Sequence, residues 1–345
     1  MYRMYDVVIV GGGPSGATLA RLIDQSKSVL IIEKTDEKSI SKLCGGLIAP
    51  DAQRMLGKFG LFLPKKVLVD PQMFYVESYD LETKNKQRYQ RFYLNINRKD
   101  FDNWLLKLVD RNVSISRNTK YLSHEYSGDS ITIQIEKNGK RDFVESKILV
   151  GADGSQSQVR RKTFNDFRYI TKYISIQSEI VGGVILPCYE VYFDRGLTDF
   201  YGWTIPKNGT NIIGIALQGK DAREKYERYL KNVLGNNFQE VSRRSTVIIR
   251  PRRLNDHKTD KDNRVFLIGE AAGFISPSSA EGLSYAFRSA EALAASINSG
   301  KNTGKDYRKR SLRIKFNLFM KNIKSIFMYT KFLRNLIFKL GIRKL

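Results

Sequence analysis

The stretch Asp6-Val-Val-Ile-Val10, followed directly by Gly11-Gly-Gly-Pro-Ser-Gly16, decides the fold of this chain. The apolar run has the length of a buried strand, and the residues after Gly16 place alanine, leucine and isoleucine at helical spacing. A second apolar run, residues 29–32, ends in Glu33. This order of strand, helix and strand predicts the first unit of a doubly wound, Rossmann-type parallel sheet.

The glycines of Gly11-x-Gly13-x-x-Gly16 each have a physical role. The first permits a tight turn, the second lets the backbone approach a pyrophosphate, and the third lets helix and strand pack closely. The N-terminus of the helix, near Ser15, would then face the anion. Glu33 is placed to accept hydrogen bonds from an adenosine ribose, and we assign its neighbour Lys34 to the same site. This motif alone does not distinguish NAD from FAD.

Composition narrows the class of protein further. With 345 residues, 41% of them hydrophobic and 27% charged, the chain can bury a large core, and its length favours two intertwined domains. The only cysteines, Cys44 and Cys188, form no CxxC pair, which favours a reducing, cytoplasmic location. The chain has only two histidines, so a His-rich metal site is not expected. A hydrolase with a Ser/His/Asp triad is also disfavoured, because few bases are present. The run 7–10 is too short for an export signal or a membrane span.

Alternating residues elsewhere predict a second, antiparallel sheet with one covered face. Its strands are expected at residues 73–79, 173–180, 189–193, 212–217 and 247–249. Further parts of the nucleotide-binding domain are expected as a helix at 101–109, strands at 148–150 and 265–268, and a helix at 281–297. We therefore predict a discontinuous FAD- or NAD-binding domain (1–70, 95–165 and 255–300), an interleaved substrate domain (71–94 and 166–254) and a basic helical tail (301–345).

The tail concentrates the positive charge of the chain. Residues 301–345 contain fourteen Lys or Arg and one Asp, a net +13 of the total +24. One helical face from Leu312 onward would hold Leu312, Phe316, Phe319, Ile323, Phe327 and Ile337, and the other would hold Lys321, Lys324, Lys331 and Lys339. This pattern predicts an amphipathic element on an anionic membrane surface, peripheral on its inner face. The alternative is a helix packed on the fold with a solvated basic face. No nucleic-acid-binding fold is recognisable, and we expect truncation after Gly300 to preserve the cofactor.

Three later motifs separate FAD from NAD by resemblance. The segments Gly151-Ala-Asp153-Gly-Ser155, Val265-Phe-Leu-Ile-Gly269-Glu270-Ala-Ala-Gly273 and Arg98-x-x-Phe-Asp102 resemble motifs of the p-hydroxybenzoate-hydroxylase-like flavoproteins. The resemblance implies FAD, with Arg98 and Asp153 beside the cofactor. It also implies that Glu270, where the family usually has Asp, holds the flavin ribitol.

Three other segments resemble the geranylgeranyl reductase family more narrowly. They are Leu43-Cys44-Gly45-Gly46-Leu47, Tyr201-Gly-Trp203-Thr-Ile-Pro206-Lys207 and Gly273-Phe-Ile-Ser-Pro277-Ser-Ser-Ala280-Glu281-Gly282. Ile205 stands where that family has Phe, and Ala280 where it has Gly. The resemblance implies FAD contacts from Cys44, Gly45, Gly46, Gly269, Gly273, Pro277, Gly282 and Leu283. It implies substrate contacts from Tyr201, Trp203, Pro206 and Lys207.

The expected reaction is reduction of carbon–carbon double bonds in an isoprenoid lipid, by hydride from reduced FAD and a proton from a site acid or water. Cys44 is a candidate acid or an ordering residue of the pocket, or else an inert loop thiol. The alternatives are a flavin monooxygenase or halogenase, because Tyr201 to Pro206 faintly resembles a halogenase motif, and a flavoprotein with a binding role only. No second GxGxxG occurs, so the electron donor, an acidic ferredoxin or NAD(P)H, would dock transiently.

Overall fold

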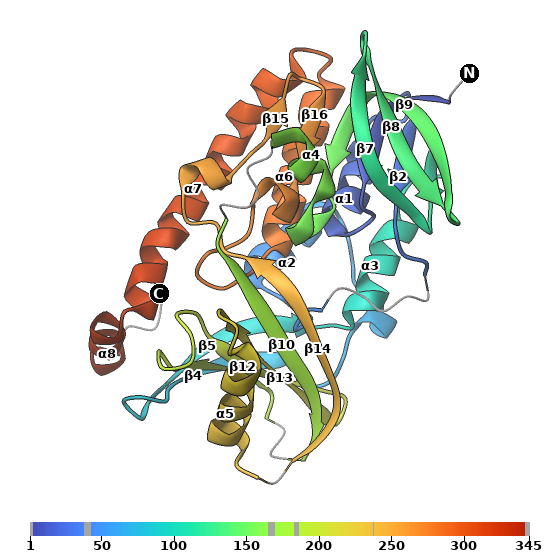
Figure 1. Cartoon of the computed structure of the whole chain (residues 1–345). Coiled ribbons are helices and arrows are strands. Elements are labelled where there is room, and N and C mark those ends of the chain that lie inside the picture. Colours follow the sequence, from blue (N-terminus) through green and yellow to red (C-terminus); the bar gives the residue numbers. More distant parts are fainter. Residues whose placement is uncertain (1–2, 38–42, 165–169, 183–185, 237, 342–345) are drawn as a thin grey trace.

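The computed structural model describes residues 3–37, 43–164, 170–182, 186–236 and 238–341, which form two eight-stranded sheets with helices around them (Figure 1). The strands are β1 (Met4–Val10), β2 (Val29–Ile32), β3 (Leu47–Ile48), β4 (Met73–Asp80), β5 (Asn85–Asn95), β6 (Val113–Ser116), β7 (Thr119–Ser127), β8 (Ser130–Lys137), β9 (Lys140–Gly151), β10 (Lys172–Val181), β11 (Cys188–Phe193), β12 (Gly202–Lys207), β13 (Thr210–Leu217), β14 (Gln239–Ile249), β15 (Asp260–Lys261) and β16 (Val265–Leu267). The α-helices are α1 (Pro14–Leu22), α2 (Pro50–Lys58), α3 (Arg98–Lys107), α4 (Gln158–Phe164), α5 (Ala222–Leu234), α6 (Leu283–Asn298), α7 (Thr303–Tyr329) and α8 (Lys331–Lys339).

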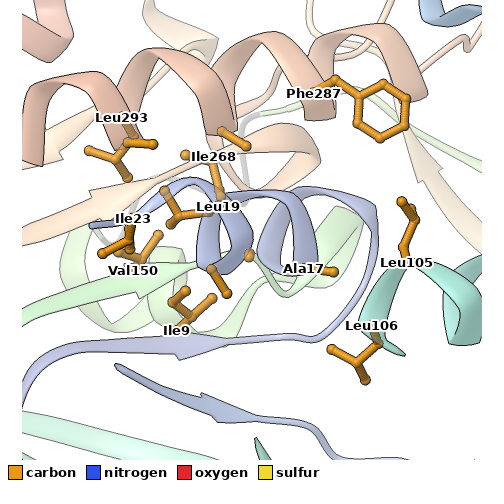
Figure 2. Packing of buried hydrophobic residues seen from close by; sticks show 14 of the residues in the cluster. Ile9, Ala17, Leu19, Ile23, Leu105, Leu106, Val150, Ile268, Phe287 and Leu293 are labelled. Atoms are coloured by element: carbon orange, nitrogen blue, oxygen red, sulfur yellow. The ribbon is translucent and has the colours of Figure 1, made fainter. Parts of the chain in front are cut away.

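The first sheet has β1 at its centre, paired in parallel with β2 on one side and β9 on the other. Side chains of β1 alternate between two cores. Val7 and Ile9 pack with α1, α3 and α6, and Figure 2 shows Ile9 near Leu19 and Val150. Val8 and Val10 point to the opposite face, which β7 and β8 cover. The predicted doubly wound sheet is therefore confirmed.

The β7–β8–β9 meander was not predicted. The sequence indicates only a strand at 148–150, whereas β9 begins at Lys140 and pairs antiparallel with β8 before it enters the parallel sheet. Ile131, Ile133 and Ile135 point from β8 into the core. The meander thus covers a sheet face that helices would otherwise have to cover.

The second sheet has the order β14-β10-β13-β12-β11-β4-β5-β3. Its pairings are antiparallel except for β4 and β11, which run parallel. The strands expected from alternation occur, although β14 is much longer than the predicted 247–249. Helix α5, which was not predicted, covers one face through Tyr226, Tyr229 and Leu230. The opposite face faces the candidate site. The residue boundaries of the two domains stay a prediction.

The C-terminal helices are part of the fold. On α7, Tyr307, Ile314 and Leu318 are buried in the cores of the first sheet, and the Tyr307 hydroxyl donates to the Leu267 carbonyl at 2.9 Å. On α8, the buried Arg334 pairs with Asp80 at 2.8 Å. A cut after Gly300 would remove these core residues, whereas retention of the cofactor after that cut stays a prediction.

The tail also differs from the single amphipathic helix expected from the sequence. Helix α7 ends at Tyr329, so Ile337 lies on a second helix and does not extend the face begun at Leu312. Residues 342–345 of the predicted tail lie outside the described residues. Among the helices that the structure describes, none is long and apolar enough to cross a membrane.

Two substitutions on α7 test this packing. Ile314→Ala should lower the free energy of unfolding by about 2–4 kcal/mol, because Ile314 is buried. The control Leu312→Ala should change it by no more than about 0.5 kcal/mol, because Leu312 is 60% exposed. Urea denaturation of both variants measures the difference. Equal effects would contradict the docking of α7 on the core.

Candidate functional site

The glycine turn between β1 and α1 has the geometry that its spacing predicts. Gly11 has φ +105°, and a Cβ there would lie 2.5 Å from the Ala152 carbonyl oxygen. A Cβ on Gly16 would lie 1.9 Å from the Gly11 carbonyl oxygen. At Gly13, by contrast, a Cβ would meet no described atom within 4 Å. No described side chain caps the N-terminus of α1. An anion could therefore approach the backbone at Gly13, next to the N–H groups of α1 that no described side chain caps.

Glu33 lies beside this turn at the end of β2. Its Oε2 accepts a hydrogen bond from the Gly12 N–H at 2.7 Å, and its Oε1 accepts from the Thr35 N–H and hydroxyl at 2.9 and 2.7 Å. Lys34, the next residue, is exposed. The carboxylate is therefore held next to the turn, as an adenosine-binding acid requires.

Two later motifs meet the glycine turn. The position of a Gly11 Cβ is 3.1 Å from the Asp153 Cα, and that of a Gly269 Cβ is 3.0 Å from the Ser15 Oγ. The Asp153 carboxylate accepts from the backbone N–H groups of two residues at the start of α4, and burial raises its pKa. Asp153 thus orders the segment that follows the parallel strand β9.

The segment 269–283 brings further predicted residues to this end of the sheet. Gly269 and Gly273 have φ +57° and +79°, and they flank a single helical turn that carries Glu270. A Cβ on Gly282 would lie 3.8 Å from the Glu270 Oε1. Leu283 is buried as the first residue of α6. The structure therefore gathers Glu270 and Gly282 beside the glycine turn.

The Cys44–Gly46 loop is held against β12 and the segment that leads into α3. A Cβ on Gly45 would lie 2.6 Å from Ile205 Cδ1. The Lys207 ammonium donates to the carbonyls of Gly46 at 3.1 Å and Ile96 at 2.9 Å, and to the side-chain oxygen of Asn95. Burial lowers the pKa of Lys207 to about 8. Since an ammonium has three protons, these three acceptors engage all of them, and Lys207 positions the loop.

Arg98 stands at the start of α3, next to the same loop. Its Nε pairs with Asp102 at 2.8 Å. Burial opposes the charge, but Asp102 and Cys44 together raise the pKa of Arg98. Cys44 is exposed, and its Sγ accepts from the Gly46 N–H at 3.4 Å. Cys44 and Arg98, each predicted beside the flavin, thus lie close together.

The loop 276–280 is held by side chains from three other elements. Arg250 Nε donates to the Pro277 carbonyl at 2.8 Å, the Tyr329 hydroxyl to Ser278 at 2.6 Å, and the Tyr201 hydroxyl to Ser279 at 2.7 Å. Ala280 has φ +49°, a conformation that favours glycine. This agrees with the Gly that the geranylgeranyl reductase family has at that position.

Aromatic rings line the site-facing side of the second sheet. Ring centroids lie 5.7 Å apart for Tyr201 and Trp203, and 5.5 Å apart for Tyr93 and Tyr189. The Trp203 ring covers Gly214, where a Cβ would lie 2.5 Å from it. Because Tyr201 binds Ser279 and Ile205 contacts Gly45, this aromatic wall borders both loops. At its end the Pro206 carbonyl accepts from Asn95 Nδ2 at 2.8 Å.

The residues present fit an FAD. The open backbone at Gly13, the uncapped helix and Glu33 would hold the adenosine diphosphate part, and Glu270 would hold the ribitol. Arg98 and the loops 44–46 and 276–282 would hold the ring. The arrangement defines an FAD-dependent oxidoreductase.

Comparisons with known proteins agree with this class. The chain belongs to the family described as FAD binding domain, whose model matches residues 4–177. It is 36% identical over 345 residues to the protein CbrA of Escherichia coli O6:H1, covering 98% of this chain and 94% of that protein.

Solved structures share the fold. A geranylgeranyl bacteriochlorophyll reductase-like protein of Thermoplasma acidophilum superposes with a TM-score of 0.83 at 19% identity, over 99% of this chain and 91% of that one. The p-nitrophenol 4-monooxygenase PnpA of Pseudomonas putida DLL-E4 gives a TM-score of 0.74 at 17% identity, over 99% and 94%. At these identities the likeness establishes the fold and not the substrate.

Sequence reasoning missed three residues that shape the site: Asn95, Arg250 and Tyr329. Asn95 and Arg250 are buried polar residues at the ends of β5 and β14. A polar residue at the end of an apolar strand, such as Arg250 after Val247-Ile-Ile249, is a usable signal, because a buried charge needs partners. Tyr329 carried no such signal, since its partner Ser278 is distant in sequence.

Two glycine substitutions separate cofactor binding from folding. Gly13→Val should leave the apoprotein folded, because no described atom lies within 4 Å of the new Cβ, but it should weaken FAD binding by about tenfold or more. Gly16→Val should also destabilise the apoprotein, because its Cβ would overlap the Gly11 carbonyl. Flavin absorbance after purification and the melting temperature of the apoprotein measure the two effects. Retention of FAD by the Gly13 variant would refute the placement of the pyrophosphate.

Proposed function

We propose that the chain reduces carbon–carbon double bonds of a polyprenyl or related isoprenoid lipid with reduced FAD. The aromatic wall of Tyr93, Tyr189, Tyr201 and Trp203 carries this proposal, because it borders both loops expected at the flavin ring. Tyr93, Tyr189 and Trp203 are only partly buried and leave apolar surface for a hydrocarbon chain. The Tyr201 hydroxyl donates to the Ser279 carbonyl, so only the apolar carbon atoms of this ring are left to contact neighbouring groups.

Reduced FAD supplies the hydride, and one proton completes the saturation of each double bond. The residues of the chain hold the hydrocarbon against the cofactor and exclude water. Cys44 or a water molecule delivers the proton in this proposal, because the protons of Lys207 are committed to Asn95, Gly46 and Ile96. The external donor, NAD(P)H or an acidic ferredoxin, docks on the basic surface.

A flavin monooxygenase is the second candidate. The likeness to p-nitrophenol 4-monooxygenase favours it, since that monooxygenase has the same fold. A halogenase is less favoured, because Tyr201 stands where the halogenase motif has Trp. The two classes differ in whether reduced FAD needs oxygen.

Anaerobic turnover decides between them. The protein is reduced with dithionite without oxygen, a polyprenyl phosphate or geranylgeranyl lipid is added, and flavin absorbance and product mass are followed. We expect reoxidation and a product two mass units heavier for each double bond. Reoxidation only by oxygen, with an oxygenated or halogenated product, would replace the reductase with a monooxygenase. Bleaching by NADPH or by reduced ferredoxin identifies the donor.

Helices α7 and α8 carry an exposed apolar face, which is a candidate surface for contact with the membrane that holds a lipid substrate. Its side chains are between 36% and 75% exposed. They are Leu312, Phe316, Phe319, Met320, Ile323, Ile326 and Phe327 on α7, and Phe332, Leu336 and Leu340 at α8. On α7 this face lies opposite the buried positions 307, 314 and 318. The helix is thus apolar on two sides, one packed on the fold and one uncovered.

We propose that this face docks on an anionic lipid bilayer, on the cytoplasmic side. Exposed apolar patches of this kind mark contact sites, and the exposed Lys309, Arg313 and Lys339 on the same helices favour anionic headgroups. A second copy of the chain is a poorer occupant, since it would bring two strongly positive tails together.

Vesicle sedimentation tests the docking. The protein should bind phosphatidylglycerol vesicles more than phosphatidylcholine vesicles, and less in high salt. Phe316→Asp should weaken binding by about tenfold or more, because about 1.5–3 kcal/mol of apolar burial is lost. The control Phe62→Asp changes an 88% exposed residue outside the face and should have no effect. Absence of vesicle binding, or a dimer broken by Phe316→Asp, would rule out the bilayer as the occupant.

A further inference from the structure

Three cations gather where α7 passes the end of the aromatic wall. Arg91 on β5 and Lys321 on α7 line a small pocket together with Ser276, Ser279, Glu281 and other residues. Lys324, one helical turn after Lys321, lies close enough to both cations to interact with them. Burial, followed by the charges of Lys321 and Arg91, lowers the pKa of Lys324 to about 8.

No ion pair joins Arg91, Lys321 or Lys324 to an acid in the described part of the chain, and Arg91 Nε is buried without a hydrogen-bond partner. The two acids in the same pocket have other partners. Asp51 pairs with Arg54, and Glu281 accepts from the Ser284 N–H and hydroxyl, both at 2.7 Å.

Such an arrangement is unfavourable in the protein alone. Partly buried like charges repel one another, and burial removes the water that would screen them. An anion with several oxygens would reverse both effects by accepting charge-assisted hydrogen bonds from all three cations. The Ser279 hydroxyl in the pocket already donates its one proton to the Ser276 Oγ at 3.0 Å, so the cations are the donors for such an anion.

We propose that Arg91, Lys321 and Lys324 form a phosphate-binding site that takes the headgroup of a phosphorylated polyprenyl lipid. The lipid part rests on the proposed function, whereas the phosphate part rests on these cations. Arg91 connects the phosphate site with the surface for the hydrocarbon chain, because its guanidinium lies 5.4 Å from the centre of the Tyr93 ring. Tyr93 belongs to the aromatic wall, so a lipid whose headgroup binds Arg91 would have its hydrocarbon chain along that wall.

Calorimetric titration of the FAD-bound protein tests the site. The probes are a short polyprenyl phosphate, the matching polyprenol and inorganic phosphate. Lys321→Gln and Lys324→Gln should each weaken binding of the polyprenyl phosphate by about tenfold or more and leave polyprenol binding unchanged. The control Lys305→Gln removes the same charge from an exposed position on α7 and should change neither.

A second measurement separates the site from a folding defect. Without ligand, Lys324→Gln should melt at or above the temperature of the wild type, because a repulsive charge is gone. Polyprenyl phosphate should raise the melting temperature of the wild type more than that of the variant.

Each outcome is decisive. If inorganic phosphate also binds, and Lys321→Gln and Lys324→Gln weaken its binding to the same extent, the anion site is supported. Its ligand is then free phosphate and not a lipid headgroup. Equal binding of polyprenyl phosphate to the wild type and both variants overturns the site, as does an equal loss with Lys305→Gln. If the phosphate binds as expected but the reduced flavin is not reoxidised without oxygen, the anion site stands and the reductase proposal fails.

Discussion

Three consecutive carbonyls, those of Pro277, Ser278 and Ser279, each accept a hydrogen bond from a side chain of a different element, and the site depends on this constraint. Arg250 comes from the end of β14, Tyr201 precedes β12, and Tyr329 ends α7. The Arg250 guanidinium is enclosed by the rings of Phe200 and Tyr329, with 4.4 and 4.5 Å to their centres. A buried guanidinium without acceptors would be costly, so the loop, both sheets and α7 hold one relative position.

The sequence predicts the parts of the fold whose signals are local. Residues 6–33 carry apolar runs, three spaced glycines and an acid in one short segment, and each of these features has a partner nearby. The meander strand β7 was missed because Lys120, His124 and Glu125 interrupt any apolar alternation. Helix α5 was missed although Tyr226, Tyr229 and Leu230 have helical spacing, because charged residues surround them.

Much of the candidate site depends on contacts between distant residues. Lys207 meets Gly46 and Ile96, more than one hundred positions away, and no pattern around Lys207 encodes those acceptors. The tail illustrates the same limit. Its exposed apolar residues were predicted as one face, but Ile314 and Leu318 form a second apolar face whose partners belong to the first sheet. Periodicity can reveal an apolar face, but it does not say what covers that face.

The burial of α7 also orders events during synthesis. Strand β1 begins at Met4, yet the two cores on its faces include Tyr307, Ile314 and Leu318. A ribosome releases the chain from its N-terminus, so β1 must wait for α7 before its surroundings are complete. Until then, apolar side chains of the central sheet stay uncovered. The nascent chain therefore has a long aggregation-prone interval in which a molecular chaperone has surface to bind.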